Sequence, residues 1–168
     1  VPYFAISPES FGKLKRLMDR EINPKIKFHL DSELYLKPEN NVNIIAEISG
    51  SDPKLKDEVV MIGAHFDSWH PASGATDNGA GSAVMMEVMR IIKATRLKPK
   101  RTIRMVLWGG EEQGYLGSMA YAQNHYGKVK ETARKKEVEK ISAYINMDNG
   151  AGQMRGIYLQ GNEAVKPI

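Results

Sequence analysis

In three short stretches of the sequence, histidine or acidic residues directly follow an apolar run. The stretches are AHFDSWH with the nearby GATDNGAG, then WGGEEQG, then NMDNG. Carboxylates that crowd one site repel each other unless cations neutralise them. Histidine with carboxylate oxygens, and without cysteine sulfur, is a donor set for zinc, with manganese or cobalt as competitors. The candidate residues are His65, Asp67, Asp77, Glu111, Glu112 and Asp148.

The spacing within these stretches suggests separate roles. His65 and Asp67 are two positions apart, so in extended chain their side chains point the same way. The Asp67 carboxylate can then hold one imidazole N–H while the other ring nitrogen binds a metal. The adjacent Glu111 and Glu112 diverge, so one can bind metal while the other accepts a proton from a water molecule. The pattern therefore predicts a metal-dependent hydrolase.

Apolar runs and helical periodicity predict the elements that position these residues. The runs are continuous, which is typical of strands covered on both faces. Strands alternate with helices, which predicts an α/β domain whose largely parallel sheet lies between helical layers, with antiparallel hairpins possible among the early strands. In such sheets the ligand site lies beyond the carboxyl ends of the strands, where the candidate residues fall. The predicted strands lie in 41–50, 58–65, 101–110 and 140–150, and the helices in 78–99 and 116–126.

The N-terminal segment differs from the remainder because its first thirty or so residues contain none of the candidate residues. Residues 7–19 predict a helix, with Ser7 as its N-cap and Pro8 in its first turn. Residues 23–36 alternate apolar and polar side chains, which predicts a half-exposed strand. Residues 1–35 are therefore expected to be a lead-in segment or the tail of a separate module.

Composition restricts the function classes. The chain has 168 residues, of which 42% are hydrophobic and 26% charged, as in globular proteins, and it contains no apolar stretch long enough to span a membrane. The absence of cysteine excludes disulfides and thiolate metal sites. The net charge is +4, but the basic run 128–140 is interrupted by glutamates and contains no aromatic residue. This run predicts a solvated helix rather than a nucleic-acid surface.

Four ordered motifs, HFD, GATDNGAG, EEQGYLGS and NMD, resemble those of the zinc exopeptidases of the M28 peptidase family. The stretches GAHFDSW and KPKRTIRMVLWGGEEQG look most similar to the plasma glutamate carboxypeptidase branch. The resemblance covers roughly residues 42–160. It implies a three-layer α/β/α fold with a mostly parallel mixed sheet, two zinc ions, a peptide substrate, and an aminopeptidase or dipeptidase activity in a secreted or periplasmic protein.

The resemblance also implies a set of zinc ligands. His65 and Asp148 would bind one zinc ion, Glu112 would bind the other, and Asp77 would bridge the two. The family pattern places a further zinc-binding histidine far downstream of Asp148. No histidine follows Asp148 in this chain, and His125, on a predicted helix, precedes it. The chain is therefore expected to be an incomplete catalytic domain, with residues 36–168 as its N-terminal part and the second zinc site incomplete.

Two further roles follow from the resemblance. Glu111 would be the general base that takes a proton from the attacking water and passes it to the leaving amine, and Asp67 would orient His65. Residues 1–35 would fit the end of a protease-associated insert. His70 and Ser68 are expected to be solvated loop residues.

Alternative interpretations remain open at this point. The scaffold could belong to a glutaminyl cyclase-like enzyme with one zinc ion, or to a non-catalytic receptor-like or binding domain. Retention of Glu111 beside four ligand candidates favours catalysis, because a binding domain needs no base at a metal site. For Asp77, the TDNGAG stretch also permits the simpler role of a helix N-cap.

Overall fold

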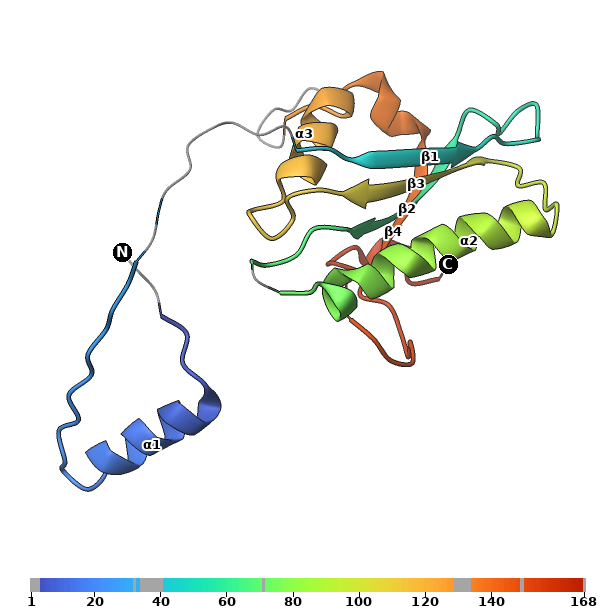
Figure 1. Cartoon of the computed structure of the whole chain (residues 1–168). Coiled ribbons are helices and arrows are strands. Elements are labelled where there is room, and N and C mark those ends of the chain that lie inside the picture. Colours follow the sequence, from blue (N-terminus) through green and yellow to red (C-terminus); the bar gives the residue numbers. More distant parts are fainter. Residues whose placement is uncertain are drawn as a thin grey trace. The chain divides into compact units, whose positions relative to one another are not determined.

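A computed structural model of the chain describes residues 4–31, 33, 41–70, 72–128, 134–148 and 150–167 (Figure 1). The chain divides into two compact units, Val1–Pro38 and Glu39–Ile168. The assignment of the first residues to a protease-associated insert stays a prediction. All of the candidate site residues belong to the second unit.

In the first unit, helix α1 (Pro8–Met18) forms where the sequence predicts it. The Ser7 side chain accepts a hydrogen bond from the backbone N–H of Ser10 at 3.2 Å, which satisfies one of the free amides at the start of the helix. Pro8 occupies the first turn, where a missing N–H costs nothing. The predicted cap and helix are therefore confirmed.

The predicted strand over 23–36 is wrong for residues 23–31 and 33, and its other residues lie outside the described part of the chain. Alternation alone cannot make a strand, because a strand needs a neighbour for its backbone hydrogen bonds. No partner strand is found among the described residues of this unit. Ile26 and Leu30 are 53% and 60% exposed, while the Phe28 ring packs on Phe4 with ring centroids 4.5 Å apart.

The second unit contains a four-stranded mixed sheet with the order β1-β3-β2-β4. β2 is parallel to both β3 and β4, whereas β1 is antiparallel to β3. The predicted α/β class with a mostly parallel sheet is thus confirmed. The strands are β1 (Ile44–Ile48), β2 (Val59–His65), β3 (Thr102–Trp108) and β4 (Ile141–Asn146).

The sequence permits antiparallel hairpins between consecutive early strands, but the antiparallel pair is β1 with β3. The connection from β1 to β2 instead runs beside the start of β3. There the Gly50 N–H donates to Thr102 Oγ1 at 3.0 Å, and the Ser51 N–H donates to the Pro99 carbonyl at 2.8 Å. In the sheet, β3 therefore lies between β1 and β2.

Helices α2 (Gly81–Ala94) and α3 (Leu116–His125) contribute to hydrophobic clusters formed by alternate residues of the central strands. In β3, Val106 and Trp108 pack in one cluster with Tyr121 of α3. The intervening residues of β3 pack in another cluster with Met85 of α2. Because alternate side chains of a strand lie on opposite faces, the two helices lie on opposite sides of the sheet. This arrangement is the predicted three-layer α/β/α architecture.

Among the described residues of the basic run, Lys136–Lys140 form a short 3-10 helix, η2, in place of the exposed helix predicted over 128–140. Residues 129–133 of this run lie outside the described part of the chain. A second short 3-10 helix, η3 (Glu163–Val165), lies near the C-terminus. None of the described helices combines the length and apolar character needed to cross a membrane.

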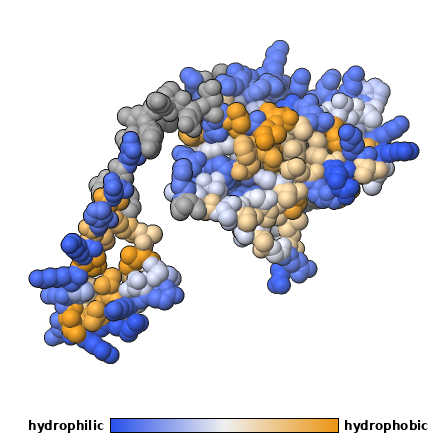
Figure 2. Space-filling view, in the orientation of Figure 1, coloured by the Kyte–Doolittle hydropathy of each residue, from blue (hydrophilic) through white to orange (hydrophobic). Residues whose placement is uncertain are grey.

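The outer strands of the sheet expose apolar side chains. Ile44 and Ile45 of β1 are 46% and 47% exposed, and Ile145 of β4 is 53% exposed. Figure 2 shows apolar surface among the charged side chains that cover much of the second unit. The buried core is consequently concentrated on β2 and β3, the strands that carry two of the three candidate stretches.

Candidate metal centre

The sheet register brings the three candidate stretches to one edge. His65, the last residue of β2, lies beside Trp108, the last residue of β3, and Gly63 lies beside Asn146, the last residue of β4. Since these three strands are parallel, the residues that follow them emerge at the same end of the sheet. The acidic residues that the sequence separates by more than eighty positions are thereby neighbours.

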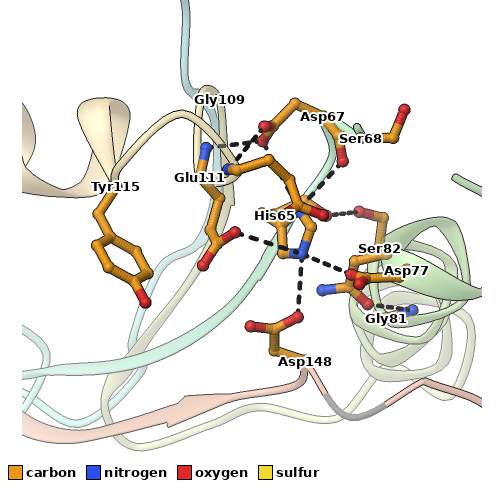
Figure 3. Close-up of polar contacts among 12 residues, drawn as sticks. His65, Asp67, Ser68, Asp77, Gly81, Ser82, Gly109, Glu111, Tyr115 and Asp148 are labelled. Atoms are coloured by element: carbon orange, nitrogen blue, oxygen red, sulfur yellow. Dashed lines mark hydrogen bonds and ion pairs between the residues drawn. The ribbon is translucent and has the colours of Figure 1, made fainter. Parts of the chain in front are cut away.

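His65 lies at the centre of this edge and is only 2% exposed. Its Nε2 atom lies 3.0 Å from Asp77 Oδ1 and 2.9 Å from Asp148 Oδ1 (Figure 3). Its Nδ1 atom lies 3.1 Å from the backbone carbonyl oxygen of Asp67. A buried imidazole therefore joins two carboxylates that come from different parts of the chain.

The hydrogen-bond partners of His65 determine what its ring can do. A carbonyl oxygen only accepts hydrogen bonds, so Nδ1 carries a proton. Nε2 then faces two carboxylate oxygens, either as an N–H donor of a charged imidazolium or as a lone pair that needs a cation beside it. One imidazole nitrogen and several carboxylate oxygens are a donor set that zinc accepts. The residues present therefore fit a zinc ion.

Electrostatics at His65 favour positive charge at this position. Burial is the largest single effect and opposes the charged form of the ring, whereas the negative charges of Asp148 and Glu111 favour it. Together with the hydrogen bonds to Asp148 and to the Asp67 carbonyl, they raise the pKa of the imidazole above its ordinary value. The same negative field that holds a proton would attract a metal cation.

The Asp67 carboxylate fixes the turn that carries the two glutamates. Its Oδ1 accepts the backbone N–H of Glu111 at 3.0 Å (Figure 3), and its Oδ2 accepts the N–H of Glu112 at 3.1 Å. The Asn43 side chain supports the same turn by accepting the N–H of Gly109 at 3.2 Å. The sequence instead predicts that this carboxylate holds His65, but Oδ1 lies 3.6 Å from Nδ1, and the Asp67 carbonyl makes the bond.

The two glutamates approach the same centre. Glu111 Oε2 lies 4.0 Å from His65 Nε2. For Glu112, a carboxylate oxygen lies within 4.8 Å of donor atoms of His65 and Asp77, so these three residues can share one ion. Burial raises the pKa of Glu111; the charge of His65 lowers it, but the charges of Asp148 and nearby acids raise it further. The net increase makes Glu111 a better proton acceptor than an ordinary glutamate.

Asp77 is not the N-cap of the following helix, so the simpler interpretation of TDNGAG is wrong. Helix α2 begins at Gly81 and its cap position is Ala80, without a side-chain cap. Asp77 lies in the preceding segment η1 (Ala75–Ala80) and has extended backbone angles, φ −114° and ψ 95°. Its carboxylate bonds to His65 instead of to a free helix amide. The helix start is stabilised differently, by Asn78, whose Oδ1 accepts the Gly81 N–H at 3.1 Å.

The remaining histidines of the second unit do not join this centre. His70 is exposed in the loop after β2, as the sequence predicts. His125 lies on α3, where Nδ1 is 3.1 Å from Glu137 Oε1 and the ring stacks on Tyr121. Three polar residues that support the site were missed in the sequence: Asn43, Asn78 and Ser82. Asn78 carries a usable signal, because it directly follows a candidate ligand and precedes a glycine-rich helix start.

Comparison with known proteins shows which proteins share these features. Residues 43–167 match the model of peptidase family M28. The chain is 32% identical to human carboxypeptidase Q over 168 residues, covering all of this chain and 33% of that protein. It is 37% identical to an aminopeptidase of Pseudomonas aeruginosa strain UCBPP-PA14 over 125 residues, covering 74% of this chain and 21% of that protein. The chain thus spans about a third of the length of the carboxypeptidase Q relatives that it matches.

Solved structures show the same relationship. The crystal structure of a peptidase M28 precursor from Shewanella amazonensis SB2B matches with a TM-score of 0.58 and 42% identity, over 67% of this chain and 23% of that one. A zinc aminopeptidase from Bacillus subtilis matches with a TM-score of 0.52 and 32% identity, over 63% of this chain and 23% of that one. The sequence, the fold and the matched residues agree, and the chain belongs to peptidase family M28.

Proposed function

We propose that the protein carrying this chain is a zinc-dependent exopeptidase, with an aminopeptidase or dipeptidase activity. The observation that carries the proposal is the position of His65 Nε2, which lies 2.9 Å from Asp148 and 3.0 Å from Asp77, with Glu111 at 4.0 Å. A buried nitrogen facing three carboxylates is an arrangement that a divalent cation stabilises. The family includes relatives described as an aminopeptidase and as carboxypeptidase Q, which supports peptide hydrolysis.

Within this proposal the chain provides ligands for two zinc ions. His65 and Asp148 would hold the first ion, and Asp77 would bridge it to the second. Glu112 would hold the second ion, together with the downstream histidine that the family resemblance implies. Donor atoms of His65, Asp77 and Glu112 lie within 4.8 Å of one another, which supports placing the ligands of both ions in one centre.

Zinc, when bound, polarises the carbonyl of the scissile peptide and makes a water molecule more acidic. Glu111 accepts the proton of that water as its oxygen attacks the carbonyl carbon. Glu111 then donates this proton to the amide nitrogen as the C–N bond breaks, giving a free amine and a carboxylic acid. The raised pKa of Glu111, caused mainly by its burial, suits a group that must both take and return a proton.

Asp67 contributes by holding Glu111 in place. Both of its carboxylate oxygens accept backbone N–H groups of the glutamate turn, at 3.0 and 3.1 Å. Its carbonyl fixes His65 with Nδ1 protonated, which presents Nε2 to the centre. One residue thus orients both the proposed ligand and the proposed base.

The experiment is chelation of the natural full-length protein followed by addition of zinc, assayed on aminoacyl and dipeptide substrates. We expect hydrolysis to disappear on chelation and to return with zinc. Retained zinc binding without hydrolysis of any of these substrates would indicate a binding domain, and cyclisation of N-terminal glutamine would indicate a glutaminyl cyclase. A secreted or periplasmic location is part of the proposal and is tested by fractionation of the source cells.

A further inference from the structure

Asn78 is an almost completely buried polar residue beside the centre, with 1% of its surface exposed. Its Nδ2 donates a hydrogen bond to the backbone carbonyl of Met147 at 2.8 Å. Its Oδ1 accepts the backbone N–H of Gly81 at 3.1 Å. Both ends of the amide are therefore satisfied, and the side chain joins the start of α2 to the segment that follows β4.

The two segments joined by Asn78 carry two of the proposed ligands. Asp77 directly precedes Asn78 at the α2 end of this link, and Asp148 directly follows Met147 at the β4 end. Met147 is also held to β2, because its N–H donates to the Gly63 carbonyl at 2.9 Å. The backbone just before Asp148 is thus fixed both by the sheet and by the Asn78 amide.

Close packing makes this link rigid. A Cβ atom added to Gly81 would lie 2.2 Å from Asn78 Oδ1 and 2.7 Å from the Met147 carbonyl oxygen. No side chain larger than that of glycine fits there without displacement of the amide or the backbone. The first turn of α2 also holds the third ligand, because Ser82 Oγ donates to the His65 carbonyl at 2.8 Å (Figure 3).

We propose that Asn78 is a positioning residue, which sets the separation of Asp77 and Asp148 so that both face His65 Nε2. The two carboxylates repel each other, because both lie close to one nitrogen, at 3.0 and 2.9 Å. Since they lie on separate segments, they could move apart without such a link. The fixed separation lets the site accept a cation with little rearrangement. This inference rests on the proposed zinc-dependent function.

The test is the zinc affinity of the natural full-length protein, measured by calorimetric titration of zinc into the metal-free form. We expect Asn78→Ala to weaken zinc binding by about 10- to 100-fold, as removal of groups that orient ligands does. Asn78→Asp keeps the shape and the acceptor for the Gly81 N–H, so its affinity should lie between those of Asn78→Ala and the wild type. Cobalt substitution should show an altered absorption spectrum in both variants.

The matched control is Tyr121→Phe, which removes another hydrogen bond of a buried side chain. The Tyr121 hydroxyl accepts a bond from Arg104 Nη1 at 2.6 Å, and the residue is 6% exposed. This variant should lose thermal stability but bind zinc as the wild type does. An equal loss of zinc affinity in Asn78→Ala and Tyr121→Phe would show that Asn78 acts only on stability, and would overturn the inference.

Two other outcomes separate this inference from the proposed function. A wild-type protein that binds zinc and hydrolyses peptides, with unchanged zinc affinity in Asn78→Ala, overturns the role of Asn78 alone. A wild-type protein that binds no zinc overturns both. If Asn78→Ala does not fold, Asn78→Asp decides the question, and wild-type zinc affinity in that variant overturns the inference.

Discussion

The carboxylate of Asp67 accepts the backbone N–H of Glu111 at 3.0 Å, so the proposed orienting residue and the proposed base are directly joined. The second oxygen of the same carboxylate accepts the N–H of Glu112 at 3.1 Å. Charge-assisted bonds of this kind are stronger than bonds between neutral groups. Asp67 therefore fixes the glutamate turn at the end of β3 to the loop at the end of β2.

Replacement of Asp67 by Asn tests this link. Asn has the same shape, but its amide group would face one backbone N–H with another donor, so one of the two bonds is lost. We expect kcat/KM of the full-length protein to fall by about 10- to 100-fold, as it does when groups that orient metal sites are removed. Asp57→Asn, which changes an exposed carboxylate before β2, is the control and should keep wild-type activity.

Glu111→Gln removes the proposed base and keeps its shape. Because glutamine cannot accept the proton of the attacking water, kcat should fall by about 10²- to 10⁴-fold while KM and zinc content stay near wild type. The control is Glu87→Gln, an exposed glutamate that pairs with Arg90 on α2. Wild-type turnover by Glu111→Gln would exclude this residue as the base.

Zinc affinity should depend on pH through His65. Its ring has a pKa above the ordinary 6.5, because the charges of Asp148 and Glu111, together with the hydrogen bonds to Asp148 and to the Asp67 carbonyl, outweigh the opposing effect of burial. In the metal-free protein the charged ring therefore stabilises the fold at pH values below 6.5, and this contribution is lost as the pH rises through the raised pKa.

Zinc must displace the proton on Nε2, so the apparent affinity should decrease by about tenfold per pH unit below that raised pKa. Calorimetric titrations in buffers of different ionisation enthalpy would count the released proton. His125→Gln alters a histidine that contacts Glu137 and should leave the pH dependence unchanged. An affinity that does not vary with pH between 6 and 8 would contradict proton displacement at His65.

The sheet core gives a prediction of stability. Met61 of β2 is 3% exposed and packs with Val106 and Trp108. Met61→Ala should lower the free energy of unfolding by about 2–5 kcal/mol, because it removes buried apolar surface and leaves a cavity. Met86 of α2 is 57% exposed, so Met86→Ala should change the free energy of unfolding by less than about 0.5 kcal/mol. Equal midpoints of denaturant unfolding for the two variants would contradict the assigned core.

Much of the fold could be predicted because local patterns and their structural partners agree. The apolar runs that end at His65 and Trp108 became strands, since each found a neighbour in the sheet and a helix on its face. The alternating segment around Phe28 had a strand pattern but no partner strand among the described residues, so the pattern was not sufficient.

The clustering of the candidate residues could be predicted, but not the contacts that they make. Spacing places His65 and Asp67 on one side of extended chain, yet the Nδ1 bond goes to the carbonyl of Asp67 rather than its carboxylate. That choice depends on the Glu111 and Glu112 amides, which are 44 and 45 residues away. Asn78 was missed for the same reason, because its partner Met147 is 69 residues distant.

The most direct measurement is X-ray diffraction from zinc-loaded crystals of the natural full-length protein, with anomalous data collected on both sides of the zinc absorption edge. We expect one anomalous peak in contact with His65 Nε2 and carboxylate oxygens of Asp77 and Asp148, and a second in contact with Asp77 and Glu112. Zinc bound elsewhere, with His65 still hydrogen-bonded directly to Asp77 and Asp148, would contradict the account.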